Sequence, residues 1–193
     1  MKQLIKQVAK VYIKSFPICI NGQWLYMSDK NIELVPAMII GKYERVMTNI
    51  IKTIVKKDDV VCDVGAYIGY YTNLFSDLVE PNGKVFSFEP NPHSYQLLRK
   101  NLLKYDRRNV IATNVAVSNN VSMQRIYMAK DKDAPDSRLF QPLGEREREY
   151  CEVWSWSLNM LLATQKCQID LIKIDVQGWE EKVLLGNFYI DSR

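Results

Sequence analysis

The stretch from Val60 to Thr72, VVCDVGAYIGYYT, decides the fold of this chain. Its apolar start predicts a short buried strand over 60–64, and the apolar and aromatic residues that follow predict a helix over 70–79. Gly65 allows a tight turn and a close approach to a ligand, because glycine has no Cβ. The free N–H groups at the start of the helix can receive an anionic group. This strand, turn and helix predict a ligand site at the carboxyl end of the strand.

A second strand, predicted over 84–88, ends in the acidic residue Glu89 of the sequence EPNP. An acidic residue at this place, some twenty residues after the first turn, can accept both hydroxyl groups of a ribose. Ligands of open α/β sheets lie at the carboxyl ends of the strands, so Asp63, Gly65, Glu89 and segment 114–116 are expected along one edge. At that edge the Asp63 carboxylate can hold an ammonium group or order the loop.

Strands and helices alternate along most of the chain, which implies βαβ units and a parallel sheet. The strand over 169–176 is rich in Ile and Leu and is therefore predicted to be central and buried on both faces. Near the start, Asn21-Gly22 separates two short apolar segments and predicts a β-hairpin. The further predicted strands span 110–117, 123–128 and 152–156, and the further helices span 43–55, 94–105, 157–164 and 180–185, the last of them ended by Gly186.

The strand over 169–176 also places acid and base side chains at the same edge. Asp175 ends this strand, where it can bind substrate, position the reacting group or cap the next helix. Lys173 lies two residues earlier and shares a side with Asp175, because side chains alternate along a strand.

The composition is that of an ordinary globular protein: 193 residues, 47% hydrophobic and 25% charged. It excludes a disordered chain, a collagen-like fibre and a disulfide-dense mini-protein. Four cysteines without a C-x-x-C pair, and a single histidine, His93, predict no metal site. We expect a cytoplasmic protein, since the cysteines are scattered and the start is not signal-like. No stretch has the ~20 apolar residues of a transmembrane helix.

Positive charge is concentrated near the start. Residues 1–57 hold ten Lys and Arg against three Asp and Glu, whereas residues 58–193 hold 16 against 19. Within residues 1–16, the side chains of Lys2, Lys6, Lys10 and Lys14 recur every four residues opposite apolar ones. This pattern predicts an amphipathic basic helix that either docks on the core or lies on an anionic surface such as a membrane.

Together these residues resemble the FkbM family of S-adenosylmethionine (SAM) dependent methyltransferases. The resemblance implies a Rossmann-like class I methyltransferase fold, an α/β fold with a mostly parallel sheet and helices on both faces. Residues 58–193 would form the SAM-binding domain, here expected to lack the last strands, and residues 1–57 an extension of helix, hairpin and helix. The matching stretches are Gly41–Glu44, Val60–Thr72, Val85–Pro92 (VFSFEPNP), Leu97–Asn101, Asn109–Ser118 (NVIATNVAVS) and Asp170–Gly186 (DLIKIDVQGWEEKVLLG).

The resemblance also implies where SAM and its methyl acceptor bind. The ribose is expected on Glu89 and the adenine beside Val115 and Ala116. Asp175 and Lys173 are the predicted catalytic residues, with Asp175 positioning the acceptor or taking its proton. Trp179 and Glu180 are predicted to contact the substrate. The full set predicted to bind the cofactor is Asp63, Gly65, Ala66, Gly69, Thr72, Glu89, Asn91, Val115 and Ala116.

Three positions depart from the family pattern. Tyr67 stands where the family usually has Asn, Gln177 where it has Glu, and Asn159 where it has Asp. Gln177 carries no charge and cannot act as a base, so any role of a carboxylate at that position is lost here.

The resemblance favours an enzyme that methylates a hydroxyl group of a sugar, a glycan or a small molecule of the natural-product type. One alternative is a nucleic-acid methyltransferase of the transfer-RNA type that uses the basic start of the chain. Another is a truncated, non-catalytic module that binds SAM or serves assembly, in keeping with Gln177 and Asn159. A sheet that ends soon after Asp175 would leave an open edge, which favours a homo-oligomer or a complementing chain. Acceptor specificity is expected in the loop over 130–150 and in the extension.

Overall fold

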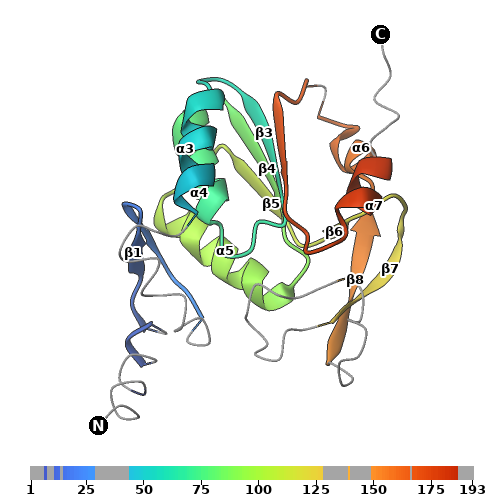
Figure 1. Cartoon of the computed structure of the whole chain (residues 1–193), viewed down its shortest axis with the longest axis horizontal. Helices are drawn as coiled ribbons and strands as arrows, with labels where there is room; N and C mark the ends of the chain where they lie inside the picture. Colours follow the sequence, from blue (N-terminus) through green and yellow to red (C-terminus); the bar gives the residue numbers. More distant parts are fainter. Residues whose placement is uncertain are drawn as a thin grey trace.

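The computed structural model describes residues 7, 11–13, 15–28, 44–127, 139, 149–165 and 167–186. A four-stranded parallel sheet with the strand order β5-β4-β3-β9 forms its centre (Figure 1). Its strands are β3 (Val60–Val64), β4 (Lys84–Phe88), β5 (Val110–Thr113) and β9 (Leu171–Ile174), and helices α4 (Tyr70–Val79) and α5 (Pro92–Lys104) connect the first three. This architecture confirms the predicted Rossmann-like α/β fold.

The register of the central sheet brings three strand ends together. Val64, the last residue of β3, lies opposite Phe88 of β4 and opposite Ile174 of β9. Backbone hydrogen bonds continue past the strands, since Gly65 N donates to Phe88 O and Asp175 N donates to Val64 O, both at 2.9 Å. The residues that follow β3, β4 and β9 therefore emerge side by side at one edge.

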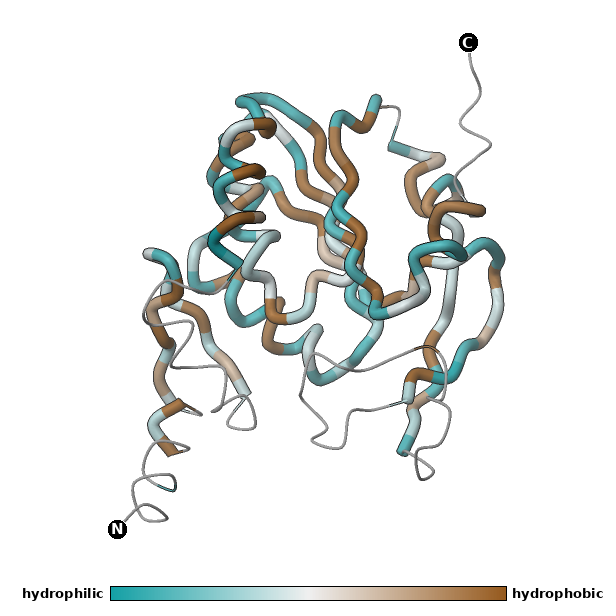
Figure 2. Tube along the Cα trace, in the orientation of Figure 1, coloured by the Kyte–Doolittle hydropathy of each residue, from teal (hydrophilic) through white to brown (hydrophobic). Residues whose placement is uncertain are grey.

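Both faces of the two inner strands, β3 and β4, are buried. Val61 and Val85 pack with α4 in one hydrophobic core, whereas Cys62, Val64 and Phe86 belong to a second core that also contains residues of α6 (Leu158–Leu162) and α7 (Glu180–Leu185). The central strands accordingly form continuous hydrophobic segments in Figure 2, as expected for a parallel sheet covered on both sides.

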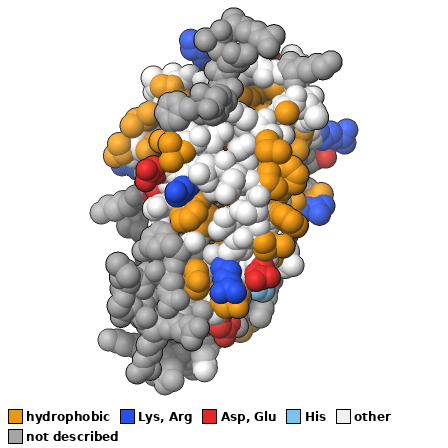
Figure 3. Space-filling view, turned by 90° about the vertical axis from the view of Figure 1, so that its right-hand side faces the viewer, with side chains coloured by type: hydrophobic (Ala, Val, Ile, Leu, Met, Phe, Trp, Pro, Cys, Tyr) orange, Lys and Arg blue, Asp and Glu red, His pale blue; other side chains and the backbone are white. Residues whose placement is uncertain are grey.

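Hydrophobic side chains also gather on the surface that carries α6 and α7, the side of the molecule seen in Figure 3. Met160, Leu184 and Leu185 contribute to this surface and are each about half exposed, at 46–51%.

A second sheet, in the order β6-β8-β7, lies beside the first. It contains β6 (Ala116–Val117), β7 (Ser122–Tyr127) and β8 (Tyr150–Trp156). The prediction of one strand over 110–117 is therefore wrong, because the chain leaves the first sheet after Thr113 and joins the second at Ala116. The side chain of Asn114 holds this break by donating to Glu89 O at 2.7 Å and to Pro90 O at 2.9 Å.

The predicted central position of strand 169–176 is also wrong for the part of the chain that the structure describes. There β9 is an edge strand with β3 as its one neighbour, and its four residues are only half-buried. The predicted helix over 180–185 is confirmed, with Gly186 as its C-cap.

The extension packs on the domain. Strands β1 (Ile18–Ile20) and β2 (Gln23–Leu25) form the predicted hairpin, in which Asn21 and Gly22 both have positive φ, 47° and 91°. Helix α3 (Arg45–Ile54) follows, and Ile51 shares a core with Phe75 of α4.

Two predicted segments lie outside the described residues. Lys2, Lys6, Lys10 and Lys14 are among them, as is most of the loop over 130–150. In the described ranges, no helix is both long and apolar enough to cross a membrane.

Candidate functional site

The loop after β3 is built on three residues with left-handed backbone conformation, Gly65, Tyr67 and Gly69, whose φ angles are 81°, 51° and 89°. A Cβ on Gly65 would collide with the carbonyl oxygen of Asp175, and a Cβ on Gly69 would lie 2.6 Å from Leu98 Cδ1. Gly65 is required for conformation and for space, because the obstacle is backbone, whereas at Gly69 the positive φ is the main reason for glycine, because the end of the Leu98 side chain can shift. The loop is thus pressed against β9 on one side and α5 on the other.

Asp63 orders this loop from beneath. Its side chain is fully buried, and Thr72 Oγ1 donates a 2.6 Å hydrogen bond to its Oδ2. Lys173 Nζ lies 3.1 Å from Oδ1, as a charged hydrogen-bond partner. Both oxygens are therefore engaged within the protein, and Thr72 is fully buried as well.

Lys173 links the loop to Asp175 at the carboxyl end of β9. Its ammonium group also donates to Gly65 O at 3.1 Å and lies 3.9 Å from Asp175 Oδ2. Lys173 and Asp175 do share a side of the strand, as the alternation of side chains predicts. The side chain of Lys173 is 14% exposed, so its charge is largely removed from water and is matched by Asp63.

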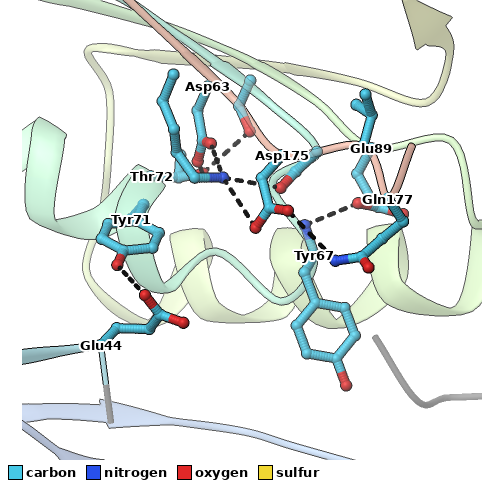
Figure 4. A network of polar contacts seen from close by, with 12 residues as sticks. Glu44, Asp63, Tyr67, Tyr71, Thr72, Glu89, Asp175 and Gln177 are labelled. Atoms are coloured by element: carbon cyan, nitrogen blue, oxygen red, sulfur yellow. Dashed lines mark hydrogen bonds and ion pairs between the residues drawn. The ribbon is translucent and has the colours of Figure 1, made fainter. Parts of the chain in front are cut away.

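Asp175 faces solvent at the carboxyl end of β9, with its side chain 56% exposed. Gln177 Nε2 donates to Asp175 Oδ1 at 3.3 Å, and Figure 4 shows the two side chains turned toward each other. Gln177 and Gly178 both have positive φ, 55° and 94°, so a sharp turn brings the amide back to the carboxylate. The residue that departs from the family pattern is thus a donor that orients Asp175.

Glu89 is the second acidic residue of the edge and is only 7% exposed. Tyr67 N donates to Oε2 at 2.7 Å, and Asn91 N donates to Oε1 at 2.9 Å. Burial raises the pKa of Glu89 to about 7, although these two N–H groups oppose the increase. Each carboxylate oxygen accepts one backbone N–H and retains a second lone pair, so the pair of oxygens fits the two hydroxyl groups of a ribose.

Most of the remaining predicted cofactor residues lie close by and are buried. Asn91 is 2% exposed and caps α5, because its Oδ1 accepts from His93 N at 3.0 Å. Ala66 belongs to a core with Leu98, and Ala116 is fully buried in the core of the second sheet. Val115 is half-buried. The contact of Val115 and Ala116 with adenine stays a prediction.

The predicted substrate residues both make structural contacts. Trp179 Nε1 donates to Ser118 Oγ at 3.2 Å, which ties the indole to the second sheet. Glu180 accepts from Val176 N at 3.2 Å and from Gly178 N at 3.1 Å. Desolvation opposes ionisation of Glu180, but the backbone N–H groups outweigh it and lower its pKa. Both residues therefore hold the turn after β9, and their contact with substrate stays a prediction.

Sequence reasoning missed a contact between the extension and the residues around the site. Glu44 precedes α3, and its Oε2 accepts a 3.0 Å hydrogen bond from the hydroxyl group of Tyr71 (Figure 4). The ammonium group of Lys173 lies 5.2 Å from the centroid of the Tyr71 ring. Glu44 falls in the matching stretch Gly41–Glu44, but that stretch carries no signal of what the carboxylate contacts. Among the described residues, no group of three His, Cys, Asp or Glu could hold a metal ion.

Comparisons with known proteins place these features in a family. The model of the methyltransferase FkbM domain matches residues 63–192. Protein-L-isoaspartate O-methyltransferase of Aeropyrum pernix is 29% identical over 111 residues, which are 55% of this chain and 43% of that protein. The enzyme of the same name from Methanothrix thermoacetophila is 31% identical over 117 residues, 56% of this chain and 54% of that protein. The chain thus spans about half the length of these relatives.

Among solved structures, precorrin-6y C5,15-methyltransferase of Geobacter metallireducens is 29% identical, with a TM-score of 0.34 over 37% of this chain and 38% of that one. The family match covers about two thirds of the chain, including the loop after β3, Glu89 and Asp175. It confirms the resemblance seen in the sequence and SAM as the cofactor. The chain belongs to the FkbM family of SAM-dependent methyltransferases.

Proposed function

We propose that this protein binds SAM along the edge formed by β3, β4 and β9 and transfers its methyl group to a hydroxyl group of a sugar, a glycan or a small molecule of the natural-product type. The observation that carries this proposal is the placement of Glu89, the glycine loop and Asp175 side by side at one sheet edge. Neighbouring strands are ~4.8 Å apart, so Glu89 and Asp175 flank the loop about 10 Å from each other, on the scale of a nucleoside and its substituent.

The residues of the loop and of β4 would hold the cofactor. Glu89 would accept the ribose hydroxyl groups, and Gly65 and Gly69 would let the backbone approach the ligand closely. Bound SAM supplies a methyl group on a positively charged sulfur, which an oxygen nucleophile can attack in line. The protein has to align the acceptor and exclude water, since positioning supplies much of the rate of such a displacement.

Asp175 would hold the acceptor. Its carboxylate is exposed next to the loop, and a neutral hydroxyl group can donate a hydrogen bond to it. As the new O–CH3 bond forms, the S–CH3 bond would break, its electron pair would return to sulfur and S-adenosylhomocysteine would leave, while the Asp175 carboxylate would take the hydroxyl proton. Gln177 orients that carboxylate, and Lys173 at 3.9 Å supports its negative charge before the proton arrives.

The charge of the site favours a neutral acceptor. Asp175 and Glu44 both present carboxylates at this edge, and like charges would repel the phosphates of a nucleic acid or a carboxylate acceptor. A carboxylate acceptor is nonetheless the second candidate, since both curated relatives are named protein-L-isoaspartate O-methyltransferases.

Transfer of a radiolabelled methyl group from SAM tests the proposal. The acceptors would be neutral oligosaccharides, an isoaspartyl peptide and transfer RNA. We expect label on the oligosaccharides that resists mild alkali, because a methyl ether is stable where a methyl ester releases methanol. Asp175→Asn should lower transfer by about 10²-fold or more, whereas the control Asp106→Asn, at an exposed turn, should leave it unchanged.

Three other results would contradict the proposal. Alkali-labile label on the peptide would assign a carboxylate acceptor, and label on transfer RNA would assign a nucleic acid. SAM binding without transfer to any acceptor would favour a non-catalytic module.

A further inference from the structure

Glu44 lies outside the strands that carry the site, but its side chain contacts Tyr71, which lies beside that site. It is exposed and precedes α3 with a left-handed backbone, φ 49°. The carboxylate is held from one side by the Tyr71 hydroxyl group at 3.0 Å. Burial, and then the nearby Glu44 charge, raises the pKa of Tyr71, so the phenol stays protonated and remains a donor.

A chain of contacts connects Glu44 to the centre of the site. The Tyr71 hydroxyl group reaches Glu44, and the Tyr71 ring lies 5.2 Å from Lys173 Nζ. Lys173 in turn pairs with Asp63 and lies 3.9 Å from Asp175. Figure 4 shows the Glu44–Tyr71 pair beside the cluster that contains Asp63, Thr72 and Asp175. Three carboxylates and one ammonium group give the network a formal charge of −2, which favours a cationic ligand.

Asp63 cannot supply the carboxylate for such a ligand. It is fully buried, and Thr72 and Lys173 engage its two oxygens. The carboxylates of the network that reach solvent are those of Asp175 and Glu44.

The two exposed carboxylates differ in their neighbours. A second ammonium group at Asp175 would approach Lys173, which already lies 3.9 Å from that carboxylate, and the two positive charges would repel. Among the residues that the structure describes, the Glu44 carboxylate is contacted by the neutral phenol of Tyr71 at Oε2, which leaves Oε1 open to a cation.

We infer that Glu44 binds the α-ammonium group of SAM, with Tyr71 as the positioning residue that holds its carboxylate. The inference rests on the proposed binding of SAM at this edge. It leaves Asp175 for the acceptor and places the two ends of the cofactor on opposite sides of the glycine loop, the ribose on Glu89 and the amino acid part toward α3.

Calorimetric titration with two probes tests this assignment. S-adenosylhomocysteine carries the α-ammonium group, whereas 5′-methylthioadenosine keeps the adenosine and the thioether and lacks the amino acid part. Glu44→Gln should weaken binding of S-adenosylhomocysteine about 10- to 100-fold, the range of one charge-assisted hydrogen bond, and leave 5′-methylthioadenosine within about twofold. Tyr71→Phe should give a smaller loss with the same selectivity. Glu181→Gln, an exposed change on α7, is the matched control and should alter neither affinity.

Each other outcome overturns the assignment. Equal loss of both probes in Glu44→Gln would mean that the variant damages the fold or the nucleoside site, and unchanged affinity for both would mean that Glu44 does not contact the cofactor. If the unaltered protein binds neither probe, the proposed function itself fails, and that result is distinct from a failure confined to the variant.

Discussion

The carbonyl oxygen of Asp175 occupies the space that a side chain on Gly65 would need. This contact joins the predicted cofactor loop to the strand end that carries the predicted catalytic carboxylate. Gly65 N also donates to Phe88 O of β4. The three strand ends of the site are therefore held together by backbone contacts, and a change in the loop should displace Asp175.

Replacing Gly65 by Ala should lower the free energy of unfolding by about 3 kcal/mol. About 1 kcal/mol comes from the left-handed backbone, and the rest comes from the collision with Asp175 O. Gly22→Ala is the matched control, since Gly22 also has positive φ but nothing lies within 4 Å of an added Cβ. Urea denaturation of both variants measures the difference. Equal decreases in the free energy of unfolding of the two variants would show that the collision with Asp175 O does not affect stability.

Tyr67→Asn should be more stable than Tyr67→Ala by about 0.5–1 kcal/mol. Tyr67 has φ 51°, and Asn tolerates this conformation better than other non-glycine residues do. Tyr67→Ala also removes the ring, but Ala tolerates a positive φ less well than Asn does. The difference in stability between the two variants therefore measures the effect of the backbone conformation. The urea midpoints should rank Asn above Ala, and the reverse order would refute the explanation.

Lys173→Met should cost about 3 kcal/mol of stability, because it leaves the fully buried Asp63 carboxylate without its cation. Adding Asp63→Asn to this variant removes the unpaired charge and should recover ~1–2 kcal/mol. A double-mutant cycle by urea denaturation gives the coupling between the two residues. Strictly additive losses would mean that the ion pair does not support the loop.

Glu89 should make stability depend on pH. Its pKa rises from 4.5 in the unfolded chain to about 7 in the folded protein, so the folded state holds an extra proton in this range. Stability from this group is therefore complete below pH 4.5 and decreases as the pH rises to about 7, by about 3 kcal/mol in total. The contribution of Glu89 is measured by comparing the free energy of unfolding of the unaltered protein and of Glu89→Gln at pH 4.5 and at pH 8. A difference between the two proteins that is independent of pH would contradict it.

The local elements of the fold could be predicted from the sequence. Strands 60–64 and 84–88 and helix 70–79 match the structure residue for residue, because short apolar runs bounded by polar residues, Gly or Pro mark their ends. The hairpin at Asn21-Gly22 follows from the positive φ that its turn requires.

Features of the fold that depend on contacts between residues distant in sequence could not be predicted. The break between β5 and β6 rests on the bonds from Asn114 to the backbone of Glu89 and Pro90, and the edge position of β9 depends on which strands lie next to it. The same holds for the site. The acidic strand ends follow from the sequence, but the burial of Asp63 under Lys173 and the contact between Glu44 and Tyr71 join residues 110 and 27 positions apart.

The most direct test of SAM binding at this edge is a calorimetric titration of the 193-residue chain and of Glu89→Ala with SAM. The predicted result is one SAM bound per chain, with affinity at least about tenfold weaker in Glu89→Ala, because the ribose loses its charged hydrogen-bond acceptor. Absence of binding at millimolar SAM, or equal affinity in the two proteins, would contradict the placement of the cofactor on β4 beside the glycine loop.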